Sequence, residues 1–118
     1  RRVLFRSTGS RLDAEGRDLY YRLASDRGHV DGTLGMIAQW SLDGLRPRLD
    51  RIESPVRCLV GNRDRAVPPA SVRRAVATMP DATVTEWPDL GHLMHEEAPG
   101  RVSDWVRQTL AEVARPRT

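Results

Sequence analysis

The fold is decided by the stretch VRCLVGNRDRAVPP, which occupies positions 56–69. It begins with a short, largely apolar run that stops at Gly61, a pattern typical of a buried β-strand. Residues 62–65 are turn formers, and the Pro68-Pro69 pair suits the first turn of a helix. The stretch therefore predicts a strand, a turn and a helix in close succession.

Two further elements follow downstream. Residues 82–87 are rich in β-branched and aromatic side chains, which favours a second strand. After Pro99, apolar residues and one threonine recur every three or four positions, as on one face of a helix: Val102, Trp105, Val106, Thr109, Leu110 and Val113. Residues 55–114 therefore predict the order strand, helix, strand, helix. This order indicates an α/β fold built on a right-handed crossover between parallel strands.

The residues that precede the first strand favour helices. Asp13 is a candidate N-cap, and Gly28 is expected to end the helix that Asp13 begins. A second helix is expected to continue as far as Pro47, because apolar residues recur at helical spacing over positions 34–45. Together the two helices would form a lid-like hairpin.

Composition excludes several classes of protein. The 118 residues carry a net charge of +3, and the arginines are spread among 16 acidic residues, so no nucleic-acid partner is expected. The single cysteine, Cys58, lies in the apolar run and predicts a reduced core thiol. No apolar run is long enough to span a membrane and no signal peptide is visible, so we expect a cytoplasmic protein.

Two strands are too few for a parallel sheet, because each strand needs neighbours and both faces need cover. We therefore expect the chain to be the C-terminal part of a longer protein. Residues 1–7 lack an initiator methionine and are interpreted as a non-native or frayed leader. Residues 8–52 are expected to form a helical cap, and residues 53–118 the end of the sheet-bearing core.

Two polar residues follow the predicted strands at their carboxyl ends, where open parallel sheets place their sites. Asp64 follows the first strand and His92 follows the second. A carboxylate that accepts a hydrogen bond from one imidazole nitrogen leaves the other nitrogen as a general base. The alternative is that Asp64 only forms a turn and His92 is an ordinary loop residue.

The histidine stretch also allows other interpretations. His92 and His95 are followed by Glu96 and Glu97, but their order fits neither zinc-binding helix pattern, so neither a metal site nor a cofactor is predicted. His95, Glu96 and Glu97 are interpreted as the turn into the last helix, where the acids favour the positive helix end. Trp105 is expected in the core, whereas Trp40 stays open as a ligand-stacking residue.

With these residues in view, the chain resembles the last third of an α/β-hydrolase. The resemblance rests on residues 59–69 and on Gly91-His92, with His92 placed 28 positions after Asp64. It covers residues 8–114 and implies that Asp64 is the acid and His92 the base of a Ser-Asp-His triad. It also implies a helical cap at residues 12–45 and a small-molecule substrate.

A narrower resemblance rests on residues 8–13, 64–69 and 91–99. These stretches look like those of the magnesium chelatase accessory hydrolases of bacteriochlorophyll synthesis. This resemblance implies a tetrapyrrole as ligand and a magnesium chelatase subunit as partner.

One departure from the α/β-hydrolase pattern limits these implications. None of the 118 residues forms the G-x-S-x-G nucleophile elbow, and Ser10 lacks both the second glycine and a preceding strand. The chain is expected to be inactive alone, with an upstream serine completing the site of the parent hydrolase. The alternatives are a non-catalytic accessory protein that binds a tetrapyrrole or the chelatase, and a generic small-molecule esterase.

Overall fold

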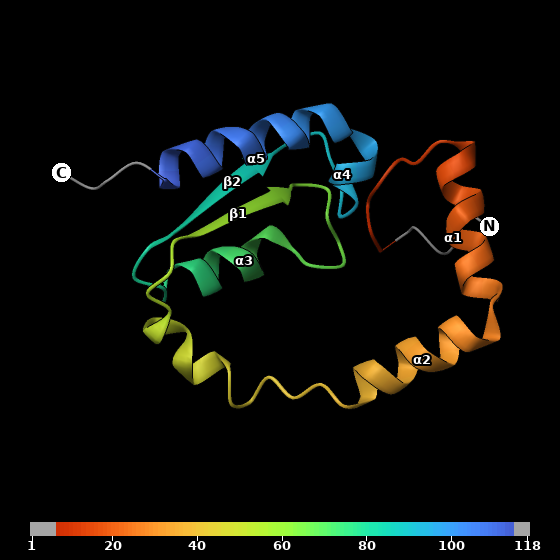
Figure 1. Ribbon diagram of the computed structural model, residues 1–118, viewed down its shortest axis with the longest axis horizontal. Helices are drawn as coiled ribbons and strands as arrows, with labels where there is room; N and C mark the ends of the chain where they lie inside the picture. The colour runs from red at the N-terminus through yellow and green to blue at the C-terminus, as the bar shows by residue number, and fades with distance from the viewer. Residues whose placement is uncertain (1–6, 115–118) are drawn as a thin grey trace.

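The computed structural model describes residues 7–114 (Figure 1). The sequence prediction of a leader at residues 1–7 therefore falls almost entirely outside the described residues. The elements, in chain order, are α1 (Ala14–Ser25), α2 (Arg27–Ala38), the 3-10 helix η1 (Arg46–Arg51), β1 (Val56–Gly61), α3 (Pro69–Val76), β2 (Ala82–Trp87), α4 (Met94–Glu97) and α5 (Pro99–Val113).

The predicted order strand, helix, strand, helix is confirmed, except that residues 95–97, expected to form a turn, lie in the short helix α4 between β2 and α5. Strands β1 and β2 pair in parallel, with Val56 opposite Ala82 and Gly61 opposite Trp87. Figure 1 shows α3 along one side of this two-stranded sheet and α5 along the other. Parallel pairing brings the carboxyl ends of both strands to the same edge, so the loops that follow Gly61 and Trp87 start side by side.

The first of the upstream helices begins as predicted, but the boundary between the two helices differs from the prediction. Asp13 caps α1 and accepts a hydrogen bond from the Gly16 amide at 2.8 Å. The expectation that Gly28 ends this helix is wrong, because Asp26 ends α1 and its side chain then caps α2 by accepting from the His29 amide at 2.7 Å. Gly28 consequently lies in the first turn of α2.

The second helix also begins and ends earlier than predicted. It ends at Ala38, and Pro47 does not stop it but lies in the first turn of η1. A proline fits this position because the first helical amides need no partner within the helix. The predicted hairpin is absent as well: Figure 1 shows α1 and α2 running in different directions from a bend at Asp26. Together they form an open elbow.

Among the described residues, the buried apolar side chains gather at the carboxyl ends of the strands: Val60, Leu90, Leu93 and Met94. The elbow of α1 and α2 leaves its large apolar side chains exposed, with Leu34 at 60% and Trp40, just beyond it, at 65%. Cys58 is a free thiol on β1, but it is only half-buried, so the prediction of a core position is wrong; its partial burial still raises its pKa. Within residues 7–114, the most buried side chains therefore lie at the sheet edge where the sequence predicts Asp64 and His92.

Candidate functional site

Asp64 is fixed by the turn that follows β1. Its amide donates to the Gly61 carbonyl at 2.9 Å, and its Oδ1 accepts from the amides of Ala66 and Val67 at 2.8 Å each. Contacts of this kind, between an aspartate side chain and the amides two and three residues later, stabilise a local turn. They leave the second oxygen, Oδ2, for another partner, on a side chain that is only 6% exposed.

That partner is His92. The structure brings the two residues together, with His92 Nδ1 2.8 Å from Asp64 Oδ2. A carboxylate only accepts hydrogen bonds, so Nδ1 carries the proton and donates it, and Nε2 is the nitrogen left to accept a proton. The His92 side chain is 41% exposed, which keeps its ring accessible beside a buried orienting acid.

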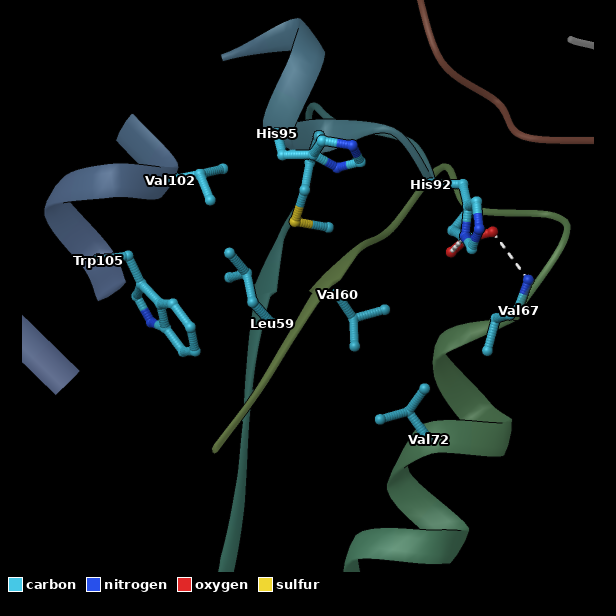
Figure 2. Close-up of a pocket in the computed structure, with 10 residues that line it drawn as sticks. Leu59, Val60, Val67, Val72, His92, His95, Val102 and Trp105 are labelled. Atoms are coloured by element: carbon cyan, nitrogen blue, oxygen red, sulfur yellow. Dashed lines mark hydrogen bonds and ion pairs between the residues drawn. The ribbon is translucent and has the colours of Figure 1, made fainter. Parts of the chain in front are cut away.

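A cavity of about 350 Å³ adjoins this pair. Figure 2 shows His92 and Val67 at one end of it, Trp105 and Val102 at the other, and Leu59 and Val60 between them. The lining is mostly apolar, with Asp64, His92 and His95 as its titratable groups. Ligand sites commonly combine an apolar pocket of this size with a few convergent polar groups.

The loop that carries His92, residues 88–93 between β2 and α4, is called the histidine loop, and residues near the start of the sequence hold it in place. The His92 amide donates to the Thr8 carbonyl at 2.8 Å, and the Leu93 amide donates to Ser10 Oγ at 2.8 Å. The 8–11 segment lies against the loop so closely that a Cβ on Gly91 would come within 2.5 Å of backbone atoms of Gly9 and Ser10. Neither contact is visible in local sequence patterns, because more than 80 positions separate the partners.

Glu97 was expected to favour the start of the last helix, and the structure gives it different contacts. Its Oε1 accepts from the Gly91 amide at 2.8 Å, and its Oε2 accepts from the Arg11 amide at 2.9 Å. Arg63 Nη2 lies 3.2 Å from the same Oε2, and the Glu97 side chain is only 4% exposed. Helix α5 begins with no side-chain cap.

The charge of Glu97 is stabilised where it is buried. Burial by itself raises the pKa of this carboxyl group. The hydrogen bonds from the Arg11 and Gly91 amides act in the opposite direction. The Ser10 hydroxyl and the positive charge of Arg63 lower the pKa further, so the net shift is downward. An ionised carboxylate is therefore the form that holds these segments together.

The other candidate residues, His95, Trp105 and Trp40, lie in different environments. His95 lines the cavity but its Nε2 lies 3.5 Å from Glu96 Oε1, away from Asp64. Within residues 7–114, no group of three or more His, Cys, Asp or Glu side chains is arranged to hold a metal ion. Trp105 lies on α5 beside Leu59 but is only half-buried, so it is not the core residue that was expected; Trp40 is 65% exposed and does not line this cavity. The part of the chain described contains no helix with the length and apolar character to cross a bilayer.

Comparison with known proteins gives two matches. Residues 1–105 match the Alpha/beta hydrolase family. The chain is also 44% identical, over 103 residues, to a protein named magnesium-chelatase 30 kDa subunit from Rhodobacter capsulatus. That alignment covers 84% of this chain and 36% of the relative, so the chain spans about a third of the relative's length.

Proposed function

The chain belongs to the α/β-hydrolase family, and from this premise we propose that it is the C-terminal part of a hydrolase of the Ser-Asp-His type. His92 is the general base and Asp64 is the acid that orients it. The nucleophile is a serine that lies outside these 118 residues, since they contain no G-x-S-x-G sequence. Residues 8–52 belong to the cap of this hydrolase and residues 53–118 to its core.

The chemistry assigned to the pair is acyl transfer from an ester. Asp64 holds the proton of His92 on Nδ1, so Nε2 takes the proton of the serine hydroxyl as the serine oxygen attacks the acyl carbon. The imidazolium then gives that proton to the leaving alcohol, and a water molecule repeats the cycle to release the acid. A positioned base of this kind contributes ~10²–10⁴-fold to the rate.

The observation that carries the proposal is the 2.8 Å contact between His92 Nδ1 and Asp64 Oδ2. It joins a buried carboxylate to an accessible imidazole beside an apolar cavity, at the sheet edge where α/β proteins bind their ligands. Turn formation alone accounts for Oδ1 of Asp64 but not for this second contact.

The test is ester hydrolysis by the full-length protein with an activated substrate such as p-nitrophenyl acetate. His92→Ala is expected to lower kcat/KM by ~10²–10⁴-fold while circular dichroism stays unchanged. His95→Ala is the matched control, because His95 lines the same cavity without contacting Asp64. If His92→Ala keeps wild-type turnover, His92 is not the base. The 118-residue chain alone is expected to be inactive.

A second candidate function is supported by the 44% identity to the protein named magnesium-chelatase 30 kDa subunit. In this alternative the protein is a cytoplasmic accessory in bacteriochlorophyll synthesis, and it assists the insertion of magnesium without hydrolysing anything. Its cavity would bind a tetrapyrrole, or its surface would bind a chelatase subunit.

Genetic complementation separates the two candidates. Deletion of the gene in a pigmented host is expected to lower bacteriochlorophyll if the accessory role holds, and unchanged pigment would contradict that role. The deletion strain is then complemented with the wild-type gene or with His92→Ala. Restoration by His92→Ala would favour a binding role, whereas restoration by the wild type alone would favour a catalytic role in pigment synthesis.

A further inference from the structure

The two residues of the candidate pair lie on separate loops, and one side chain contacts both loops. Glu97 accepts from the amide of Gly91, the residue before His92, at 2.8 Å. Its other oxygen lies 3.2 Å from the guanidinium of Arg63, the residue before Asp64. A single carboxylate thus contacts the residue that precedes each member of the pair.

The same carboxylate also holds the 8–11 segment against the histidine loop. Glu97 Oε2 accepts from the Arg11 amide at 2.9 Å, and the neighbouring Ser10 hydroxyl lowers the pKa of the same carboxyl group. Ser10 Oγ in turn accepts from the Leu93 amide at 2.8 Å. Leu93 follows His92 in the chain, whereas Gly91 precedes it. The loop is therefore held on both sides of His92: Gly91 bonds Glu97 directly, and Leu93 bonds Ser10, whose neighbour Arg11 bonds Glu97.

From these contacts we propose that Glu97 is the positioning residue that sets the distance between His92 and Asp64. It touches neither the ring of His92 nor the carboxylate of Asp64, so its effect passes through the backbone. This role rests on the proposed function of the pair, because the distance matters for turnover only if His92 is the base. The charge is part of the role, since three donors, the Arg11 and Gly91 amides and the Arg63 guanidinium, converge on one buried carboxylate.

The geometry predicts what a neutral isostere does. Glu97→Gln keeps the shape but replaces one oxygen with an NH₂ group, which turns a donor toward either the Gly91 amide or the donors on Oε2. Either the Gly91 amide or the donors to Oε2 then lose their acceptor, and the two loops shift relative to each other. A displacement of this kind is expected to lower kcat by ~10–100-fold with little change in KM.

Glu96→Gln is the matched control. Glu96 is the preceding residue on α4, but it bonds Tyr20 and His95 rather than the histidine loop. The neutral substitution at Glu96 is expected to leave kcat within about two-fold of the wild type. Ser10→Ala is a milder second variant, because it removes the acceptor of the Leu93 amide and leaves the Glu97 carboxylate with its Arg11, Gly91 and Arg63 partners. It is expected to give a smaller loss in the same direction.

A second measurement separates this proposal from the proposed function. Proton NMR of the full-length protein reports the His92 Nδ1–H resonance, which shifts far downfield when it is hydrogen-bonded to Asp64, whether or not the protein hydrolyses esters. In Glu97→Gln this resonance is expected to weaken or disappear while circular dichroism and the Glu96→Gln spectrum stay unchanged. If the resonance persists in Glu97→Gln, or is lost equally in Glu96→Gln, Glu97 does not position the pair. An absence of esterase activity in the wild type would instead contradict the proposed function.

Discussion

Asp64 and His92 are separated by 28 positions in sequence and by 2.8 Å between Oδ2 and Nδ1 in space. The two oxygens of Asp64 have different partners: Oδ1 ties down the turn, whereas Oδ2 faces the imidazole. The turn-forming role and the orienting role of this aspartate, which looked like alternatives in the sequence, are therefore compatible. A residue that is rigid for local reasons makes a good orienting acid, because little further ordering is needed.

The substitution Asp64→Asn separates these two roles. The amide oxygen of the variant side chain can still accept from Ala66 and Val67, so the turn should form and circular dichroism should match the wild type. The amide NH₂ would face His92 Nδ1, which then has to accept, and the proton moves to Nε2. We expect ester hydrolysis to fall by ~10²–10⁴-fold. Nitrogen-15 NMR of the His92 ring checks the tautomer, and an unchanged Nδ1–H tautomer would contradict the assignment.

Gly9 is a site where substitution should be costly. Its φ is +65°, and a Cβ there would overlap the carbonyl group of Arg63. Gly9→Ala is expected to lower the free energy of unfolding by ~2–4 kcal/mol, combining the left-handed backbone with overpacking. Gly100→Ala is the control, since a Cβ on Gly100 meets no atom within 4 Å and alanine favours a helix. Urea denaturation of both variants checks the contrast, and equal midpoints would contradict it.

Acid stability should depend on Glu97. The pKa of this carboxyl group is lower in the folded than in the unfolded protein, because the hydrogen bonds and Arg63 outweigh the effect of burial. The resulting stabilisation is present above the unfolded pKa and is lost as pH falls through the folded pKa. Between about pH 5 and pH 3, urea midpoints of the wild type should therefore fall more steeply than those of Glu97→Gln. Parallel curves would contradict this.

Tyr20 should titrate late. Burial, the hydrogen bond to Glu96 and the negative charge of Glu96 together raise its pKa to about 12. The absorbance difference between the wild type and Tyr20→Phe during alkaline titration isolates this group. In Glu96→Gln the midpoint is expected to move down but to stay above the ordinary tyrosine value of about 10, because burial is the largest cause. A midpoint unaffected by Glu96→Gln would contradict the contact between α1 and α4.

Sequence patterns predict the elements that are decided locally. The apolar run ending at Gly61 and the stripe that begins after Pro99 correspond to the observed strand and helix, since proline and glycine mark their ends. The same kind of pattern is misleading over residues 39–45, where apolar residues at helical spacing lie outside any helix. Gly32 and Gly35 lower the helix propensity just before α2 ends, and the apolar residues beyond Ala38 are exposed, with Leu42 at 56%. Leu34, inside α2, is as exposed as Leu42, so apolar spacing and exposure do not by themselves fix where this helix ends.

The site was predictable in one respect and hidden in another. Parallel strands bring their carboxyl ends together, so the proximity of Asp64 and His92 followed from strand order. The part played by Glu97 did not, because one of its donors, Arg11, is 86 positions away and no local period links them. Only the folded chain shows that a residue interpreted as a helix start ties three segments together.

The bond from the His92 amide to the Thr8 carbonyl has a consequence for the order of folding. Strands β1 and β2 can pair once a short crossover has closed, whereas this bond closes a loop of more than 80 residues, which carries a larger entropic cost. We therefore expect the sheet to form first and the histidine to reach its place last. Hydrogen exchange should then find the amides of His92 and Leu93 less protected than those of β1, so that local opening interrupts the chemistry long before the fold is lost.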